Sequence, residues 1–306
     1  MRWFGWFRRG ARPQGAQSHG VAEDRRFRQI GGRSYVRGSP YLLPKDDAEI
    51  NRLDFQHYML RFALRSNYLA PLGQPRDILD VGTGTGRWAL EMALAFPGAN
   101  VVGIDLVAPP VDAEAGTKRP DIRPENYAFV TANILERLPF TGMSFDFVHQ
   151  RLLVGAIPAM RWPEVIVELV RVTRPGGWVE LVEAAPPPDG GPALRALCEW
   201  LVAACDKRGL DAVVGPKIGG MLQAAGLQGV RYQEVDLPIG RYGGRLGALS
   251  ETNLISFLGS LRGLILSYGL TDDQEFAAAL TAVRQEIAGG RFIWPYFVAY
   301  GQRPPA

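Results

Sequence analysis

The sequence predicts an α/β fold with a doubly wound parallel sheet. From residue 77 onward, short apolar strands alternate with helical stretches, which is typical of a parallel sheet covered by helices on both faces. A glycine-rich turn joins the first of these strands to the helix that follows it. The chain has 306 residues, of which 47% are hydrophobic and 21% are charged. One large domain with a sizeable core is therefore expected.

The predicted elements follow one another in a regular order. A helix over 46–68 begins with acidic residues at its positive dipole end, and apolar residues recur along one face, with His57 among them. Seven strands are predicted at 77–81, 100–106, 127–133, 145–150, 178–184, 229–237 and 292–302. The other predicted helices are 86–96, 163–173, 193–208, 216–226, 247–267 and 272–288.

Charge is unevenly distributed along the chain. Nine arginines and two acidic residues give residues 1–40 a charge of +7, whereas the whole chain carries +3, so the remainder carries −4. A basic, flexible leader over 1–32 is predicted. Contact of its aromatic and arginine residues (3–12) with a membrane surface is the disfavoured alternative. The acidic body holds only four lysines, so no nucleic-acid partner is expected.

Several classes of protein are excluded. No apolar run approaches the roughly 20 residues that a membrane-spanning helix needs, and residues 1–20 lack the apolar core of a secretory signal. Cys198 and Cys205 cannot form a disulfide framework, which indicates a cytoplasmic protein. These two cysteines are seven residues apart on one predicted helix face, so they have core spacing, and no metal site is expected.

The clearest functional motif of the sequence is in the segment ILDVGTGTGRWALEMA (78–93). A strand reaches Asp80, a turn holds Gly82, Gly84 and Gly86, and a helix begins at once. Glycine lets the backbone pass close to a ligand or adopt positive φ, and a helix N-terminus offers free N–H groups. Such turns bind either a dinucleotide or S-adenosylmethionine (SAM).

The spacing of the turn favours SAM. In the dinucleotide pattern G-x-G-x-x-G the third glycine would fall on Arg87, whereas this turn reads D-x-G-x-G-x-G. A carboxylate at Asp80 would repel a pyrophosphate but would attract the ammonium group of a methionine moiety. An NAD-dependent oxidoreductase is therefore the disfavoured alternative.

Over residues 76–184 the chain resembles the class I SAM-dependent methyltransferases. Asp80–Gly86 resembles motif I, FDFVHQRLL resembles motif IV, and LVRVTRPGGWVELVE resembles the helix–Pro-Gly-Gly–strand unit that precedes the fifth strand. Beyond this range, AYGQRP (299–304) resembles the family's last strand. The resemblance implies a Rossmann-like, seven-stranded sheet with SAM as cofactor. It also implies a ribose contact by Asp105 and adenine contacts by Leu106, Asn133 and Ile134. The implied cofactor-binding residues are Asp80, Gly82, Thr83, Gly84, Gly86, Asp105, Leu106, Asn133, Ile134, His149 and Gln150.

His149 is the main candidate for catalysis. It lies at the carboxyl end of a predicted central strand, where ligands collect in open α/β sheets, and a histidine there can accept a proton. The alternative is that His149 and Gln150 only line the methionine pocket. His57, Tyr35 and Tyr41 are candidates for contact with the acceptor or for closure over the cofactor, with plain packing as the alternative for each.

A narrower resemblance concerns residues 33–61, which are similar to the segment before motif I in LaeA-like and UMTA-type methyltransferases. That group includes regulators of secondary metabolism and pathway enzymes. The resemblance implies methyl transfer to a small molecule, such as a natural product. A SAM-binding regulatory protein with little turnover is the alternative. The methylated atom (oxygen, nitrogen or carbon), the acceptor and the oligomeric state stay open.

Three parts are expected along the chain. The leader is followed by an N-terminal helical extension over 33–75 and by the methyltransferase domain over 76–306. Within that domain, the helices before the last strand, about 245–290, are expected to form a lid over the acceptor. This lid and residues 33–70 are where specificity for the acceptor is expected.

Overall fold

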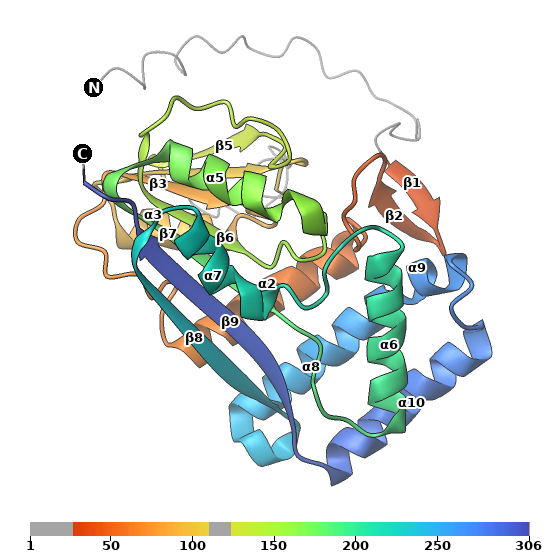
Figure 1. The fold of residues 1–306 in the computed structure, drawn as a ribbon. Helices are drawn as coiled ribbons and strands as arrows, with labels where there is room; N and C mark the ends of the chain where they lie inside the picture. The colour runs from red at the N-terminus through yellow and green to blue at the C-terminus, as the bar shows by residue number, and fades with distance from the viewer. Residues whose placement is uncertain (1–26, 110–123, 306) are drawn as a thin grey trace.

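A computed structural model describes residues 27–109 and 124–305, and a seven-stranded sheet forms its centre (Figure 1). The strand order is β5-β4-β3-β6-β7-β9-β8. β9 is antiparallel to both of its neighbours, whereas the other pairs are parallel. The strands are β3 (Asp77–Val81), β4 (Asn100–Asp105), β5 (Tyr127–Thr131), β6 (Phe145–Arg151), β7 (Thr173–Ala184), β8 (Gln228–Ile239) and β9 (Phe292–Gln302). The predicted doubly wound α/β fold is confirmed.

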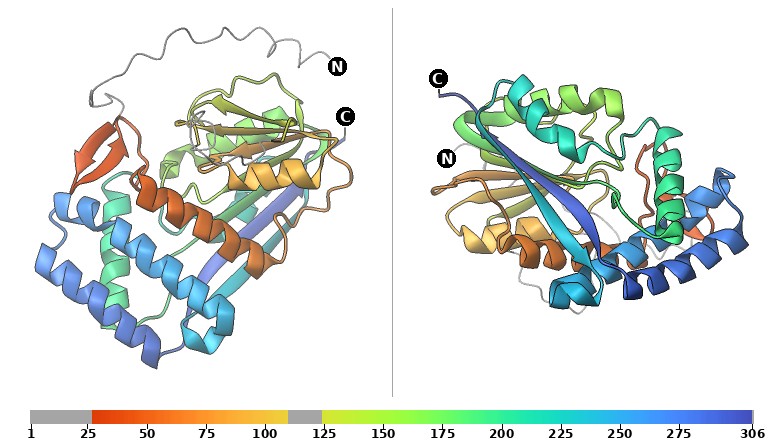
Figure 2. Two further views of the ribbon diagram at one scale, coloured as in Figure 1. Left: turned by 180° about the vertical axis from the view of Figure 1, so that it is seen from behind. Right: turned by 60° about the horizontal axis from the view of Figure 1, so that its bottom comes forward.

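Helices cover both faces of the sheet. α5 (Trp162–Val172) and α7 (Ile218–Ala224) lie in front of it in Figure 1. Seen from behind, α2 (Asp47–Leu64) and α3 (Arg87–Ala95) lie on the opposite face (Figure 2). Burial of the apolar face of α5, from Val165 to Val172, shows why the sequence forms a helix there.

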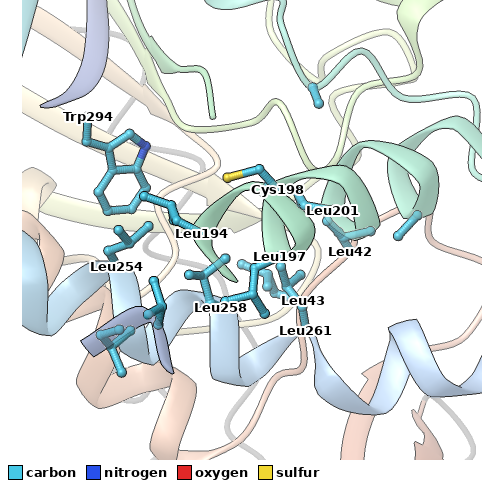
Figure 3. Packing of buried hydrophobic residues seen from close by; sticks show 14 of the residues in the cluster. Leu42, Leu43, Leu194, Leu197, Cys198, Leu201, Leu254, Leu258, Leu261 and Trp294 are labelled. Carbon is cyan, nitrogen blue, oxygen red and sulfur yellow. The ribbon is translucent and has the colours of Figure 1, made fainter. Parts of the chain in front are cut away.

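Four helices form a separate layer at one end of the molecule, which we call the helical layer (Figures 1 and 2). They are α6 (Pro192–Asp206), α8 (Gly244–Ser260), α9 (Arg262–Ser267) and α10 (Asp273–Gly289). The long β8–β9 pair joins this layer to the sheet. Figure 3 shows its core, in which leucines of α6 and α8 gather in one cluster with Trp294 at its side, near Leu194 and Leu254.

The first turn of α6 is held by a side chain from α10. The carboxylate of Glu286 accepts hydrogen bonds from the backbone N–H groups of Ala193 (2.7 Å) and Leu194 (3.0 Å). These are donors that a helix N-terminus leaves without intrahelical partners. A Cβ at Gly191 would lie 2.3 Å from that carboxyl group. The glycine therefore makes the contact between α6 and α10 possible.

A small hairpin precedes α2 and was not predicted from the sequence. β1 (Phe27–Ile30) pairs antiparallel with β2 (Arg33–Val36), and the turn between them has two glycines with positive φ. β1 and the turn after it lie within the segment predicted as a flexible leader (1–32), so that prediction is wrong for residues 27–32. Residues 1–26 of that segment are outside the described residues. The side chain of Arg33 donates to both carboxylate oxygens of Asp46, the N-cap of α2. This pairing lowers the pKa of Asp46.

Most predicted boundaries agree with the structure to within a few residues. Two predicted elements differ more. The helix predicted over 247–267 is divided at Leu261 into α8 and α9. β7 begins at Thr173 and not at Trp178, because Thr173 already pairs with Phe145 and the register shifts before Trp178 pairs with Phe147. Within the described ranges, no helix is both long and apolar enough to cross a bilayer.

Candidate functional site

A large pocket lies at the carboxyl edge of the parallel strands and extends to the helical layer. The segment that links β2 to α2, residues 37–46, runs along the pocket and is called the strap here. Polar groups gather at one end of the pocket, whereas its other end is mostly apolar. The apolar wall includes Leu42, Leu152, Cys198, Leu201, Leu254, Phe257, Leu258 and Trp294. Figure 3 shows several of these side chains from close by.

The glycine-rich turn is an open cradle of backbone. Gly82, Gly84 and Gly86 all have positive φ (69°, 57° and 77°), a region that other residues rarely adopt. A Cβ at Gly82 would lie 2.6 Å from Leu153, whereas a Cβ at Gly84 would meet no atom closer than 3.8 Å. Gly84 therefore leaves space toward the pocket that it lines. α3 begins directly after this turn, and Gly86 is its N-cap.

Two acidic residues support the turn from the strand ends. Asp80 accepts a hydrogen bond from Thr83 Oγ1 (2.6 Å), and the N–H of Thr83 donates to the carbonyl of Ile104 (2.8 Å). At the end of β4, one oxygen of Asp105 accepts from the N–H of Gly84 (2.9 Å). Both carboxylates line the pocket. The structure thus brings these two residues to one pocket, and their contacts with a cofactor stay predictions.

Asp105 also contacts the strap. Its second oxygen lies 3.3 Å from the ammonium group of Lys45. The same ammonium group lies 5.6 Å from the ring centre of Tyr41, within the range of a cation–π contact. Lys45 was not singled out from the sequence, because 60 residues separate it from Asp105.

The residues expected near adenine lie together at the rim of the pocket. Leu106, Asn133 and Ile134 all line it. The side-chain oxygen of Asn133 accepts from the N–H of Leu135 (3.0 Å), and its amide nitrogen donates to Glu136 (3.1 Å). The amide of Asn133 is thus engaged in its own turn, and a ligand would have to compete for it.

The structure places His149 inside the protein, outside the wall of the pocket. Its ring stacks on Trp88 with 3.9 Å between centroids. Its Nδ1 lies 3.1 Å from the Asp80 carboxylate. Burial lowers the pKa of the imidazole. This placement suits a residue that orients Asp80, and it does not favour direct proton transfer with an acceptor.

Gln150 points to the opposite face of the sheet from His149, as alternation along a strand requires. Its amide donates to Glu183, whose carboxyl group also accepts from the N–H groups of Leu153 (2.8 Å) and Val154 (3.0 Å). Burial raises the pKa of Glu183 to about 8. Gln150 and Glu183 thus hold the turn that follows β6, and Gln150 does not line the pocket.

The three acceptor candidates have different surroundings. Tyr41 and His57 line the pocket, whereas Tyr35 is buried and does not line it. His57 Nδ1 lies 3.1 Å from Nη2 of Arg151. Its Nε2 lies 3.2 Å from the Glu91 carboxylate without the geometry of a hydrogen bond. Burial, with the charge of Arg151, lowers the pKa of His57 to about 4, so the imidazole is neutral at pH 7.

Several polar residues of the pocket were not predicted from the sequence. They are Lys45, Arg52, Gln56, Arg151 and Tyr296. For Arg151 a signal was present, because it is a charged residue at the carboxyl end of a central strand. The others come from the strap, α2 and β9, and only the tertiary fold brings them together. In the parts of the chain that the structure describes, no three His, Cys, Asp or Glu side chains gather as a metal site.

Comparisons with known proteins identify the family. A methyltransferase-domain family model matches residues 78–177. Methyltransferase str3 of Strobilurus tenacellus is 34% identical over 209 residues, which cover 66% of this chain and 71% of that protein. Methyltransferase pytC of Aspergillus terreus is 31% identical over 309 residues, or 91% of this chain and 89% of that protein. The chain belongs to the SAM-dependent methyltransferases. The resemblance found in the sequence is thereby confirmed, and SAM is the cofactor.

Two further comparisons describe the range of this methyltransferase's relatives. The secondary metabolism regulator laeA of Aspergillus flavus is 33% identical over 183 residues, covering 58% of this chain and 47% of the regulator. Among solved structures, a candidate methyltransferase from an antibiotic biosynthesis pathway of Anabaena variabilis superimposes with a TM-score of 0.51 at 17% identity. It covers 79% of this chain and 97% of that one, and it supports the fold alone.

The pocket of this methyltransferase fits the cofactor. The free space at Gly84 admits a ligand to the bare backbone of the turn. Asp80 and Asp105 place two carboxylates in this pocket, and SAM carries an ammonium group and ribose hydroxyls, which are groups that a carboxylate can bind. An anionic pyrophosphate would meet the same carboxylates with repulsion.

Proposed function

We propose that this methyltransferase transfers the methyl group of SAM to an apolar small molecule that binds beneath the helical layer. One observation carries the proposal: the pocket continues without interruption from the glycine-rich turn to an apolar wall built by α6, α8 and β9. Apolar lining with a few placed polar groups is typical of small-molecule sites. In this proposal, residues 76–306 form the catalytic domain and α8–α10 act as its lid.

Each cofactor-binding residue has a proposed role. Asp80 attracts the ammonium group, and the backbone of Gly82, Thr83, Gly84 and Gly86 forms the floor. At the other end, Asp105 accepts hydrogen bonds from the ribose hydroxyls, while Leu106, Asn133 and Ile134 surround the adenine. His149 and Gln150 act from behind the wall, the first on Asp80 and the second on the turn at Leu153.

The chemistry depends on position more than on a strong base. SAM supplies an electrophilic methyl group when it is bound. The protein's own part is to exclude water and to hold the acceptor in line, and both lower the barrier to substitution. Tyr41 and His57 are proposed to contact the acceptor. Because His57 is neutral and its Nδ1 already accepts from Arg151, we assign it an orienting role.

A second function is supported by a separate observation. The similarity to the regulator laeA favours a protein that binds SAM and acts through a partner with little turnover. The same similarity supports a natural product as the acceptor if turnover occurs. The buried, unpaired thiols of Cys198 and Cys205 support a proposed location in the reducing cytoplasm.

One experiment separates these functions. The full chain is incubated with methyl-labelled SAM and a metabolite extract, and label is followed in the small-molecule and protein fractions. Label in a small molecule that is absent with the D105A variant supports the proposed function. Cofactor binding by calorimetry without any labelled product favours the regulatory role. Label confined to protein would contradict the small-molecule acceptor.

A further inference from the structure

Arg151 has a charge that nothing in the described chain neutralises. It ends β6 and lines the pocket between the glycine-rich turn and the apolar wall. Its side chain makes one polar contact with the described residues, the 3.1 Å contact of Nη2 with Nδ1 of His57. Arg151 is half-buried, and burial lowers the pKa of its guanidinium. The surface that it keeps open therefore faces the pocket and not bulk water.

A second arginine in the same pocket, Arg52, has the usual carboxylate partner of a buried arginine. Arg52 is buried on α2, and its guanidinium donates to both oxygens of Glu49 (2.9 and 2.6 Å). It also donates to the side chain of Asn253 (3.3 Å). The charge of Arg52 is thus balanced within the fold. Arg151 lacks such a partner, although an unpaired charge in a desolvated site is strongly unfavourable.

His57 cannot balance Arg151. A guanidinium only donates hydrogen bonds, so Nδ1 of His57 must be the acceptor and carries no proton. In the neutral imidazole the proton is then on Nε2, which faces Glu91. The pair Arg151–His57 therefore keeps a net charge of +1. His57 fixes the direction of the guanidinium without removing its charge.

The nearest carboxylates are already engaged elsewhere. Asp80 accepts from Thr83 and lies against His149. Glu91 is bound by Arg61 and Asn67. Glu180 accepts from two backbone N–H groups, of Leu69 and Ala70 (2.7 Å each). These groups act on Arg151 only through space. Among the described residues, no carboxylate side chain therefore accepts a hydrogen bond from Arg151, which lines the pocket.

We propose that Arg151, oriented by His57, binds a carboxylate group of a molecule in the pocket. The planar guanidinium matches a carboxylate with two parallel hydrogen bonds. Two molecules can supply this group: the methionine end of the cofactor, or an acceptor that is otherwise apolar. The proposal rests on the proposed small-molecule function for the second source only. Binding measurements separate the two sources without any need for turnover.

The cofactor arm compares two ligands by calorimetry. S-Adenosylhomocysteine has the carboxylate, whereas S-adenosyl-3-thiopropylamine keeps the amine and lacks it. If the cofactor supplies the group, R151M should weaken binding of the first by about 10- to 100-fold and leave the second unchanged. R151K should lose less, because it keeps the charge. Arg76→Met is the matched control, since Arg76 is exposed at the opposite end of β3 and does not line the pocket.

The acceptor arm uses protein saturated with S-adenosylhomocysteine. trans-Cinnamate and its uncharged amide are titrated as probes of similar shape. If an acceptor supplies the carboxylate, the wild type should prefer cinnamate, and R151M should lose that preference while Arg76→Met keeps it. His57→Leu, which frees the guanidinium to turn, should reduce the preference in whichever arm is positive.

The thermal stability of R151M without ligand is an independent readout. Since methionine replaces an unbalanced charge with an apolar chain, we expect the melting temperature to stay the same or to rise. A fall of more than about 5 °C would overturn the proposal, because it would show that the charge is compensated within the fold. The proposal is equally overturned if R151M changes neither ligand preference. A failure of methyl transfer alone would count against the proposed function and not against this site.

Discussion

The two ends of the pocket are built by different means. At the cofactor end, backbone groups do most of the work, as in the bonds from Thr83 to Ile104 and from Gly84 to Asp105. At the acceptor end, apolar side chains of α6 and α8 meet Trp294, and packing sets their positions. The end at the glycine-rich turn therefore depends on a few glycines and carboxylates, whereas the apolar end depends on the packing of many side chains.

The largest expected effect is at Gly82. An alanine there would adopt an unfavourable positive φ and press its Cβ against Leu153, so the combined strain is about 2–5 kcal/mol. We expect G82A to lose measurable cofactor binding in calorimetry. G176A is the control, because Gly176 also has positive φ but open space around it. Intact binding in G82A would show that the turn is not the cofactor's floor.

A substitution in the apolar wall of the pocket should lower the stability of the fold more than it changes cofactor affinity. Leu254 is buried in the core of the helical layer, so L254A should lower the free energy of unfolding by about 3 kcal/mol. Affinity for S-adenosylhomocysteine should change less than about twofold, since uncoupled sites behave additively. Denaturant unfolding and calorimetry measure the two quantities. A large loss of cofactor affinity would mean that the two ends are not separable.

At Asp105 the expected effect is about 2 kcal/mol. D105A removes a charged hydrogen-bond acceptor, so cofactor affinity should fall by about 30-fold. Asp236→Asn is a suitable control, because Asp236 is exposed on β8, away from the pocket. Calorimetric binding equal to that of the wild type would contradict the ribose-binding role of Asp105.

A substitution at His149 tests whether its contact with Asp80 contributes to cofactor binding. His149→Phe keeps a ring to stack on Trp88 and loses the contact with Asp80. We expect about a 10-fold loss of cofactor affinity and an unchanged pH profile of methyl transfer. A profile that loses its acidic limb only in this variant would instead identify His149 as the base, because a base is inactive when protonated.

The smallest expected effect is a pH dependence of stability caused by Glu183, which holds the turn after β6. Glu183 has a pKa of about 8 in the fold because it is buried, so the folded state holds a proton that the unfolded chain releases at lower pH. Stability from this group is present below the unfolded pKa and is lost as pH rises through 8. Between pH 6 and 7 the loss should be about 1 kcal/mol. E183Q imitates the protonated form and should flatten this slope in thermal unfolding, whereas equal slopes would argue against a protonated Glu183.

Features that depend on local patterns could be predicted from the sequence, whereas contacts between distant segments could not. Alternating strands and helices with one glycine-rich turn indicated the sheet, because these patterns are local. The hairpin at 27–36 was missed because its strands are short and rich in polar residues. The contact between His57 and Arg151 spans 94 residues, and only the tertiary fold brings α2 and the end of β6 together. The burial of His149 against Asp80 and Trp88 could not be predicted either, because a strand pattern does not show which polar side chain a helix covers.

The strap links two parts of the molecule that are far apart in the sequence. It reaches Asp105 through Lys45. Its backbone carbonyls at Pro40 and Tyr41 accept hydrogen bonds from Arg208, in the segment after α6 (3.0 and 2.5 Å). The strap therefore cannot move away from the pocket without breaking contacts both at the end of β4 and after α6.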